Sequence, residues 1–221
     1  MIFFKKQYFI FGASIGYGVG GTKGGWAGLL KMHIHNQLYG KNGISEKAEV
    51  YNFAKPGAQI SFVLNNFKTQ LDQFKRSNRI TVFLLVGLND VKSTGCPDNY
   101  LSSEEKFKEE YSELFSRMSS EFGEINVLGY CHVDESKLNP KVSPFDGSKS
   151  YFNNKRIGEF NGYLKEICSK FDKVKFISMD NISKNWVEEC LFEDGLHPND
   201  LGHKLIFERI KSELDGLLVY E

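Results

Sequence analysis

Residues 80–86 read I-T-V-F-L-L-V, and six of these seven residues are apolar. β-Branched and aromatic side chains favour strands, and a bounded apolar run of this length fits a buried strand. The run lacks the alternation of polar and apolar residues that a half-exposed strand shows. It therefore predicts a strand covered on both faces, as in a parallel sheet packed between helices.

Four other short segments have the same character, and the stretches between them carry apolar residues at helical spacing. Strands that alternate with helices predict one α/β sheet joined by right-handed crossovers. A weaker helix is predicted at Asn66–Phe74. The other helical stripes begin at Trp26, Phe107, Ile157 and Leu201. The four further strands are Tyr8–Phe11, Val50–Phe53, Ile125–Gly129 and Val174–Ser178.

Composition excludes several classes of protein. The 28 Lys and Arg residues balance 28 Asp and Glu residues, so the chain lacks the basic surplus typical of nucleic-acid binding. No apolar run approaches the roughly 20 residues of a membrane-spanning helix. The apolar N-terminal stretch is interrupted at Lys5 and Lys6 and shows no signal-peptide cleavage pattern, so we expect a cytoplasmic protein. No change in composition marks a boundary, and we expect one domain over residues 1–221.

The segment after the first predicted strand is rich in glycine and fits two motifs. Residues 11–21 read F-G-A-S-I-G-Y-G-V-G-G. A G-x-G-x-x-G pattern, typical of dinucleotide-binding folds, starts at Gly16. A G-x-S-x-G pattern, typical of a nucleophilic serine, starts at Gly12 and has Ser14 at its centre. The two interpretations make different demands on the rest of the chain.

A dinucleotide site needs its first glycine at the end of the strand and an acidic residue at the end of the second strand. Here four residues separate Phe11 from Gly16. The second strand ends in N-F-A, residues 52–54, which contains no carboxylate. These departures weigh against a nucleotide-binding oxidoreductase, which stays as an alternative hypothesis.

Near the C-terminus, the sequence D-G-L-H-P-N-D favours the serine interpretation. A serine hydroxyl is a poor nucleophile until a base takes its proton, and an imidazole suits that task. The imidazole needs a carboxylate to fix its tautomer and stabilise its charged form. Asp194 and His197 can supply this pair from one loop, with Glu193 and Asp200 as rival carboxylates. The pattern predicts that His197 and its carboxylate meet Ser14.

Four blocks of the chain resemble those of the GDSL or SGNH hydrolases, which supply Ser, Gly, Asn and His in this order. The first is G-A-S-I-G-Y-G, followed by G-G-W at Gly24–Trp26. The second is N-F-A-K-P-G-A with Gly57, and the third is V-G-L-N-D with Asn89. The last is D-G-L-H-P-N, and the four blocks span residues 12–199 in the family's order. A standard α/β-hydrolase fits less well, because its serine follows several strands.

The resemblance implies a flavodoxin-like three-layer α/β/α sandwich with a five-stranded parallel sheet. It also implies hydrolysis through an acyl-serine intermediate, without a metal or an organic cofactor. Ser14 would be the nucleophile, His197 the general base and then acid, and Asp194 the carboxylate that orients the imidazole. The oxyanion hole would comprise the backbone N–H groups of Ser14 and Gly57 and the side-chain amide of Asn89. One such donor is typically worth about 3–4 kcal/mol in the transition state.

Some residues of the blocks also fit a second interpretation, and one position departs from the family pattern. Gly57 follows Pro56 and also fits a type II turn. Asn89 and Asp90 also fit a helix cap or a turn. The family usually carries Asp before the serine, whereas this chain has Ala13, so we expect different hydrogen bonding in that turn.

The expected substrate is a small-molecule carboxylic ester with an acetyl or short acyl group. Acyl thioesters and lysophospholipids are alternatives within the family, and a non-catalytic binding module is an alternative from another class. We expect the loops at residues 91–101 and 131–153 to set specificity, because both follow strands at the edge where open α/β sheets bind ligands. Candidate side chains for substrate contact are His132, Tyr151, Phe152, Trp186 and Phe192.

Overall fold

The computed structural model describes residues 6–39, 48–143 and 146–215. Part of the N-terminal stretch discussed above, residues 1–5, lies outside this described part. Five strands of the described part form one sheet in which every neighbouring pair is parallel. In spatial order they are β2 (Ala48–Asn52), β1 (Lys6–Gly12), β3 (Ile80–Leu85), β5 (Glu124–Leu128) and β8 (Val174–Ile177).

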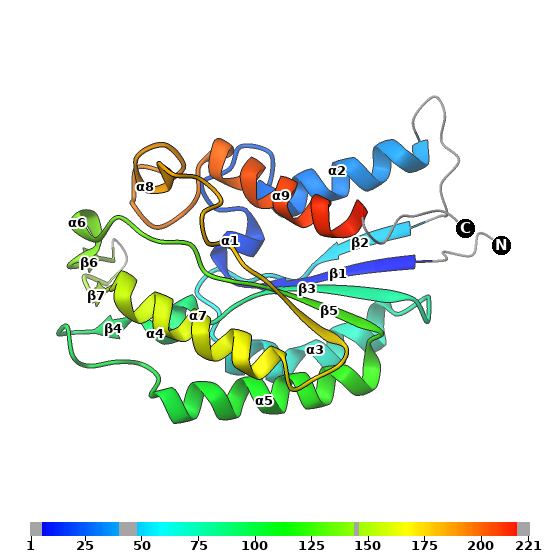
Figure 1. Ribbon diagram of the computed structural model, residues 1–221, viewed down its shortest axis with the longest axis horizontal. Coiled ribbons are helices and arrows are strands. Elements are labelled where there is room, and N and C mark those ends of the chain that lie inside the picture. The colour runs from blue at the N-terminus through cyan, green and yellow to red at the C-terminus, as the bar shows by residue number, and fades with distance from the viewer. Residues whose placement is uncertain (1–5, 40–47, 144–145, 216–221) are drawn as a thin grey trace.

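Helices cover both faces of this sheet (Figure 1). One face carries α2 (Gly25–Tyr39) and α9 (Asp200–Asp215), which pack against each other. The other face carries α3 (Ile60–Phe74), α5 (Glu104–Glu121) and α7 (Asn154–Cys168). The structure therefore confirms the predicted three-layer α/β/α sandwich with five parallel strands.

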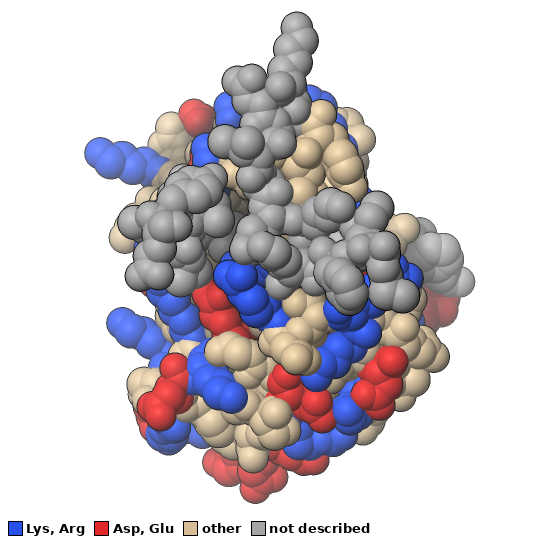
Figure 2. Space-filling model, turned by 90° about the vertical axis from the view of Figure 1, so that its right-hand side faces the viewer, with Lys and Arg blue, Asp and Glu red and all other residues tan. Residues whose placement is uncertain are grey.

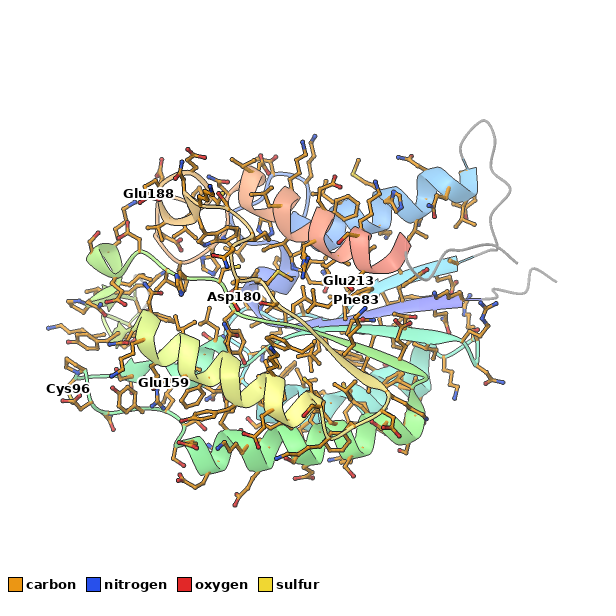
Figure 3. All side chains as sticks on the ribbon, viewed as in Figure 1. Phe83, Cys96, Glu159, Asp180, Glu188 and Glu213 are labelled. Carbon is orange, nitrogen blue, oxygen red and sulfur yellow. The ribbon has the colours of Figure 1, made fainter. Side chains whose placement is uncertain are left out.

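The central strand β3 behaves as its composition predicts. All six of its residues are buried. Phe83, labelled in Figure 3, lies toward α2, and its ring centroid is 6.3 Å from that of Trp26. Because side chains alternate along a strand, Val82 and Leu84 face the opposite helical layer. The strand is covered on both faces, and that is why its sequence shows no alternation.

Two details of the fold differ from the prediction. The helix expected at Asn66–Phe74 begins six residues earlier, at Ile60, where the backbone N–H donates to the Asp90 carboxylate at 3.2 Å. The expected irregular loops contain a second, three-stranded antiparallel sheet. Its strands are β4 (Ser93–Thr94), β7 (Lys149–Tyr151) and β6 (Lys141–Val142), in that spatial order. Strands of two or three residues are too short to show a periodicity, so the sequence could not reveal them.

Charge is mixed on the face of the molecule that Figure 2 shows. Basic and acidic side chains alternate over the part of this face that grey atoms do not cover, so no single sign dominates it. Within the described residues, no helix is both long enough and apolar enough to cross a membrane.

Candidate active site

Ser14 lies at the carboxyl end of β1, as the first residue of the short helix α1 (Ser14–Tyr17). The N–H of the preceding residue, Ala13, donates to the Leu85 carbonyl at the end of β3, at 3.0 Å. The side chain of Asn52, at the end of β2, donates to the Gly16 carbonyl at 2.9 Å. The family usually has Asp at the position of Ala13, and an alanine side chain cannot form hydrogen bonds. In this chain, hydrogen bonds with the ends of β2 and β3 hold the turn.

Asp194 and His197 lie on a short hairpin. Its two sides meet at an antiparallel bridge between Leu191 and Pro198. The Phe192 N–H donates to the His197 carbonyl at 2.7 Å, inside that bridge. Main-chain hydrogen bonds therefore fix the spacing between the carboxylate and the imidazole.

The structure brings Ser14, His197 and Asp194 together in a continuous chain of hydrogen bonds. Ser14 Oγ is 2.9 Å from His197 Nε2, and His197 Nδ1 is 2.6 Å from Asp194 Oδ2. Since an ionised carboxylate can only accept, Nδ1 carries the proton and Nε2 is left to accept from the hydroxyl. This is the tautomer in which an imidazole can take a proton from serine.

Asp194 stays ionised because donors surround it. Its Oδ1 accepts the backbone N–H groups of Leu196 and His197, each at 3.0 Å. Its Oδ2 accepts Lys141 Nζ at 2.8 Å as well as the imidazole. Burial raises the pKa of Asp194, but the hydrogen bonds from His197, Lys141 and the two backbone N–H groups outweigh it and hold the pKa well below its usual value.

The rival carboxylates are placed elsewhere. Asp200 accepts from the Thr22 hydroxyl at 2.7 Å and from the Thr22 N–H at 2.8 Å. Glu193 is exposed to solvent on the hairpin. Of the three candidates, Asp194 is therefore the carboxylate that contacts His197.

The glycine-rich segment packs closely against the histidine hairpin. Gly20 has φ +88°, and a Cβ there would lie 2.2 Å from the Pro198 carbonyl oxygen. The buried His203 of α9 also holds this segment: its Nδ1 accepts the Trp26 N–H at 3.2 Å, and its Nε2 donates to the Val19 carbonyl at 2.9 Å. Close backbone packing explains the run of glycines, so the run itself does not call for a dinucleotide-binding role.

The remaining block residues are Gly57, on the loop before α3, and Asn89, in the single helical turn of α4 (Leu88–Val91). Asn89 Nδ2 donates to the Ala58 carbonyl at 2.9 Å, which leaves the second N–H of the amide for another acceptor. The Ala58 N–H donates to the Lys55 carbonyl at 3.0 Å, and Gly57 between them has φ +78°. With Pro56 before it, Gly57 therefore fits the type II turn that its sequence also allowed.

Ser14 and Asn89 line one small cavity, whereas Gly57 lies outside its lining. The space that a water-sized group can enter there measures about 20 Å³. That is room for roughly one water molecule or methyl group. Apart from Ser14 and Asn89 the cavity is mainly apolar, and its walls include Leu85, Val86, Leu88, Tyr130, Phe152 and Leu196.

Two buried tyrosines hold the backbone of Val86, one of the residues that line this cavity. The hydroxyls of Tyr111 and Tyr130 both donate to the Val86 carbonyl, at 2.6 and 2.8 Å. Val86 precedes the turn that carries Asn89, and the turn residue Gly87 lies against the Tyr130 hydroxyl. The sequence did not single out either tyrosine, because their contact with this turn is purely tertiary.

The other candidate contact residues do not all gather at this cavity: His132 and the buried Trp186 line a separate hollow. Phe152 lines the cavity, as predicted. His132 is exposed, and its carbonyl accepts the Trp186 Nε1–H at 2.9 Å, which gives Trp186 a structural contact. Phe192 is 44% exposed, and Tyr151 lies on β7. Across the described ranges, no cluster of three or more His, Cys, Asp or Glu residues is placed to hold a metal ion.

Asp90 links the Asn89 turn to α3, and its burial makes a testable prediction. Burial raises the pKa of Asp90 from 3.8 to about 7, with nearby Glu110 adding to the rise and the Ile60 N–H opposing it. The folded protein then binds this proton more tightly than the unfolded chain, so its stability falls as the pH rises from about 4 to about 7. The full shift corresponds to about 4 kcal/mol.

Urea unfolding of wild type and Asp90→Asn from pH 4.5 to 8 measures this contribution. The stability of the wild type relative to the variant should fall as the pH rises, by about 3 kcal/mol over this range. Asp98→Asn, which removes an exposed carboxylate, is the control and should leave the slope unchanged. Parallel curves for wild type and Asp90→Asn would show that Asp90 does not titrate in this range.

The three-layer sandwich, with these polar side chains at the carboxyl edge of its sheet, defines a hydrolase of the GDSL class. Residues 8–210 match the family described as GDSL-like Lipase/Acylhydrolase, and the chain belongs to that family. No curated protein sequence matches the chain.

Solved structures share the fold at low sequence identity. A lipase/acylhydrolase from Enterococcus faecalis is 18% identical, with a TM-score of 0.67 and 96% of each chain covered. The esterase EstA from Pseudoalteromonas sp. is 15% identical, with a TM-score of 0.65 over 97% of this chain and 99% of that one. A variant of an acetyl xylan esterase from Geobacillus stearothermophilus is 13% identical, with a TM-score of 0.66 over 95% and 94%. At these identities the likeness concerns the fold alone.

Proposed function

We propose that this GDSL-family hydrolase cleaves a small carboxylic ester with an acetyl or other short acyl group, through an acyl-serine intermediate. The observation that carries the proposal is the unbroken contact from Ser14 Oγ through His197 to Asp194. His197 Nε2 takes the hydroxyl proton as Ser14 Oγ attacks the ester carbonyl. The imidazolium that forms is stabilised by the ionised Asp194.

The oxyanion of the tetrahedral intermediate needs donors that are already in place. Ser14 and Asn89 line the same cavity, which supports the assignment of the Ser14 N–H and the second N–H of Asn89 to this role. The Gly57 N–H is a third donor in the proposal, on the loop that Asn89 holds through Ala58. His197 then gives its proton to the leaving alkoxide, and a water molecule activated by the same imidazole hydrolyses the acyl-serine.

The size of the cavity favours a short acyl group. Its roughly 20 Å³ match the methyl group of an acetyl ester, which supports an acetyl or similarly short acyl group. The acetyl xylan esterase among the structural neighbours is named for removal of the same group.

A panel of p-nitrophenyl esters tests this proposal. We expect kcat/KM to be highest for the acetate and to fall by about ten-fold or more for each methylene group that the cavity excludes. Phe152→Ala removes a wall of the cavity and should raise the butyrate-to-acetate ratio, whereas Phe192→Ala, at an exposed position, should not change it.

Preference for octanoate, or for an acyl thioester over the matching ester, would contradict the short-ester assignment. Each would favour the corresponding alternative within the family, a lysophospholipase or a thioesterase. Absence of hydrolysis across the panel would instead favour a binding module.

A further inference from the structure

Lys141 contacts the proposed catalytic carboxylate, although its segment has no catalytic role in the assignment above. Its Nζ lies 2.8 Å from Asp194 Oδ2, the same oxygen that accepts His197 Nδ1 at 2.6 Å. The two side chains are only partly exposed, at 28% and 27%. The Lys141 ammonium therefore lies closer to Asp194 than the roughly 4–6 Å within which one charge changes the protonation of another group.

The small antiparallel sheet places Lys141 beside Asp194. Lys141 begins β6 and pairs with Ser150 of β7, which in turn pairs with Thr94 of β4. A separate backbone hydrogen bond joins this segment to the histidine hairpin, from the Asp134 N–H to the Gly195 carbonyl at 2.8 Å. Main-chain contacts therefore hold the segment on the hairpin, and the ammonium of Lys141 is not needed for that attachment.

We propose that Lys141 is a positioning residue that shares the Asp194 carboxylate with His197 and extends the activity of the enzyme to lower pH. This inference rests on the proposed function of the Ser14 site. The ammonium offsets part of the carboxylate charge, so Asp194 stabilises the imidazolium less strongly. Neutral His197, the form that can take the serine proton, then persists to more acidic pH.

Other charged groups around the pair do not replace Lys141. His203, from α9, faces His197 from the side of the glycine-rich segment, and burial lowers its pKa, which keeps it neutral. The ion pair between Lys137 and Asp134, at 3.5 Å, lies beside Gly195 and carries no net charge.

Lys92, which follows the short helix α4 (Leu88–Val91), is a further cation whose charge interacts with that of Lys141. Burial lowers the pKa of Lys92, and the positive charge of Lys141 lowers it further. Lys92 therefore lies near Lys141, whereas Asp194 accepts its hydrogen bonds from Lys141, His197 and the Leu196 N–H. We expect Lys92→Met to have a smaller effect than removal of Lys141.

The pH dependence of kcat/KM for p-nitrophenyl acetate tests the proposal. In Lys141→Met, the acidic limb should move to higher pH by about one unit, within a range of roughly 0.5–2 units. Lys141→Arg keeps the positive charge and should restore the wild-type limb. Lys149→Met removes an exposed lysine from the adjacent strand β7 and should leave the limb in place.

A purely structural role predicts a different pattern. Lys141→Met would then lower kcat at every pH without moving the acidic limb, and that result overturns the proposal. An unchanged pH dependence of kcat/KM in Lys141→Met also overturns the proposal. A limb that moves to lower pH has the wrong sign and also overturns it.

A measurement that needs no turnover separates this proposal from the proposed function. The ring-proton signals of His197, assigned with His197→Gln, can be titrated by NMR in the wild type and in Lys141→Met. The titration curve should move to higher pH in the variant even if no ester is hydrolysed. An unchanged curve overturns the role of Lys141, whereas absence of hydrolysis with a shifted curve contradicts only the proposed function.

Discussion

Ser14→Ala is expected to reduce ester hydrolysis by about 10⁴-fold or more, because the acyl-serine route has no other nucleophile. The Ser14 hydroxyl lies 2.9 Å from His197 Nε2. The backbone of Ser14 begins α1, and alanine is compatible with that position, so the fold should survive. The rate of p-nitrophenyl acetate hydrolysis at pH 8 measures the effect.

A second Ser→Ala variant is the control for any general effect of removing a serine hydroxyl. Ser116→Ala removes an exposed serine of α5 and should keep the wild-type rate. Unchanged thermal unfolding of Ser14→Ala would show that the loss is chemical. Hydrolysis by Ser14→Ala at more than a few per cent of the wild-type rate would contradict the assignment of the nucleophile.

His197→Ala is expected to lower kcat/KM by about 10²–10⁴-fold, which is the usual contribution of a general base. The imidazole is nearly buried and bridges Ser14 Oγ and Asp194 Oδ2, so no other side chain can take the proton directly. Its removal leaves the oxyanion donors in place, and some residual rate above the uncatalysed reaction should remain. Steady-state kinetics with the acetyl ester give the ratio.

His132→Ala provides the comparison for this loss. His132 follows β5 near the same edge of the sheet, its carbonyl accepts the Trp186 Nε1–H and the residue is exposed, so its side chain should be dispensable. Equal losses in the two histidine variants would show that the effect is not specific to His197.

The sequence predicted the main sheet because each strand is long enough to carry a pattern. The run at residues 80–86 identified a buried parallel strand, and all of β3 is buried. The start of α3 could not be predicted in the same way. Its first N–H donates to Asp90, thirty positions along the chain, and local residues do not encode such a contact.

The same distinction between local patterns and distant contacts applies to the residues of the site. Ser14, Asp194 and His197 belong to short motifs at the ends of predicted elements, and the structure brings all three together. Lys141 belongs to no motif. It reaches Asp194 only because two irregular segments pair as a small sheet, so the sequence alone could not assign it.

The most direct test of the central claim is the intact mass of the protein after reaction with a fluorophosphonate, which labels an activated serine. We predict one adduct per chain on the wild type, mapped to Ser14 by peptide analysis, slow labelling of His197→Ala, and no adduct on Ser14→Ala. An unlabelled wild type, or an adduct that persists in Ser14→Ala, would contradict the proposed mechanism.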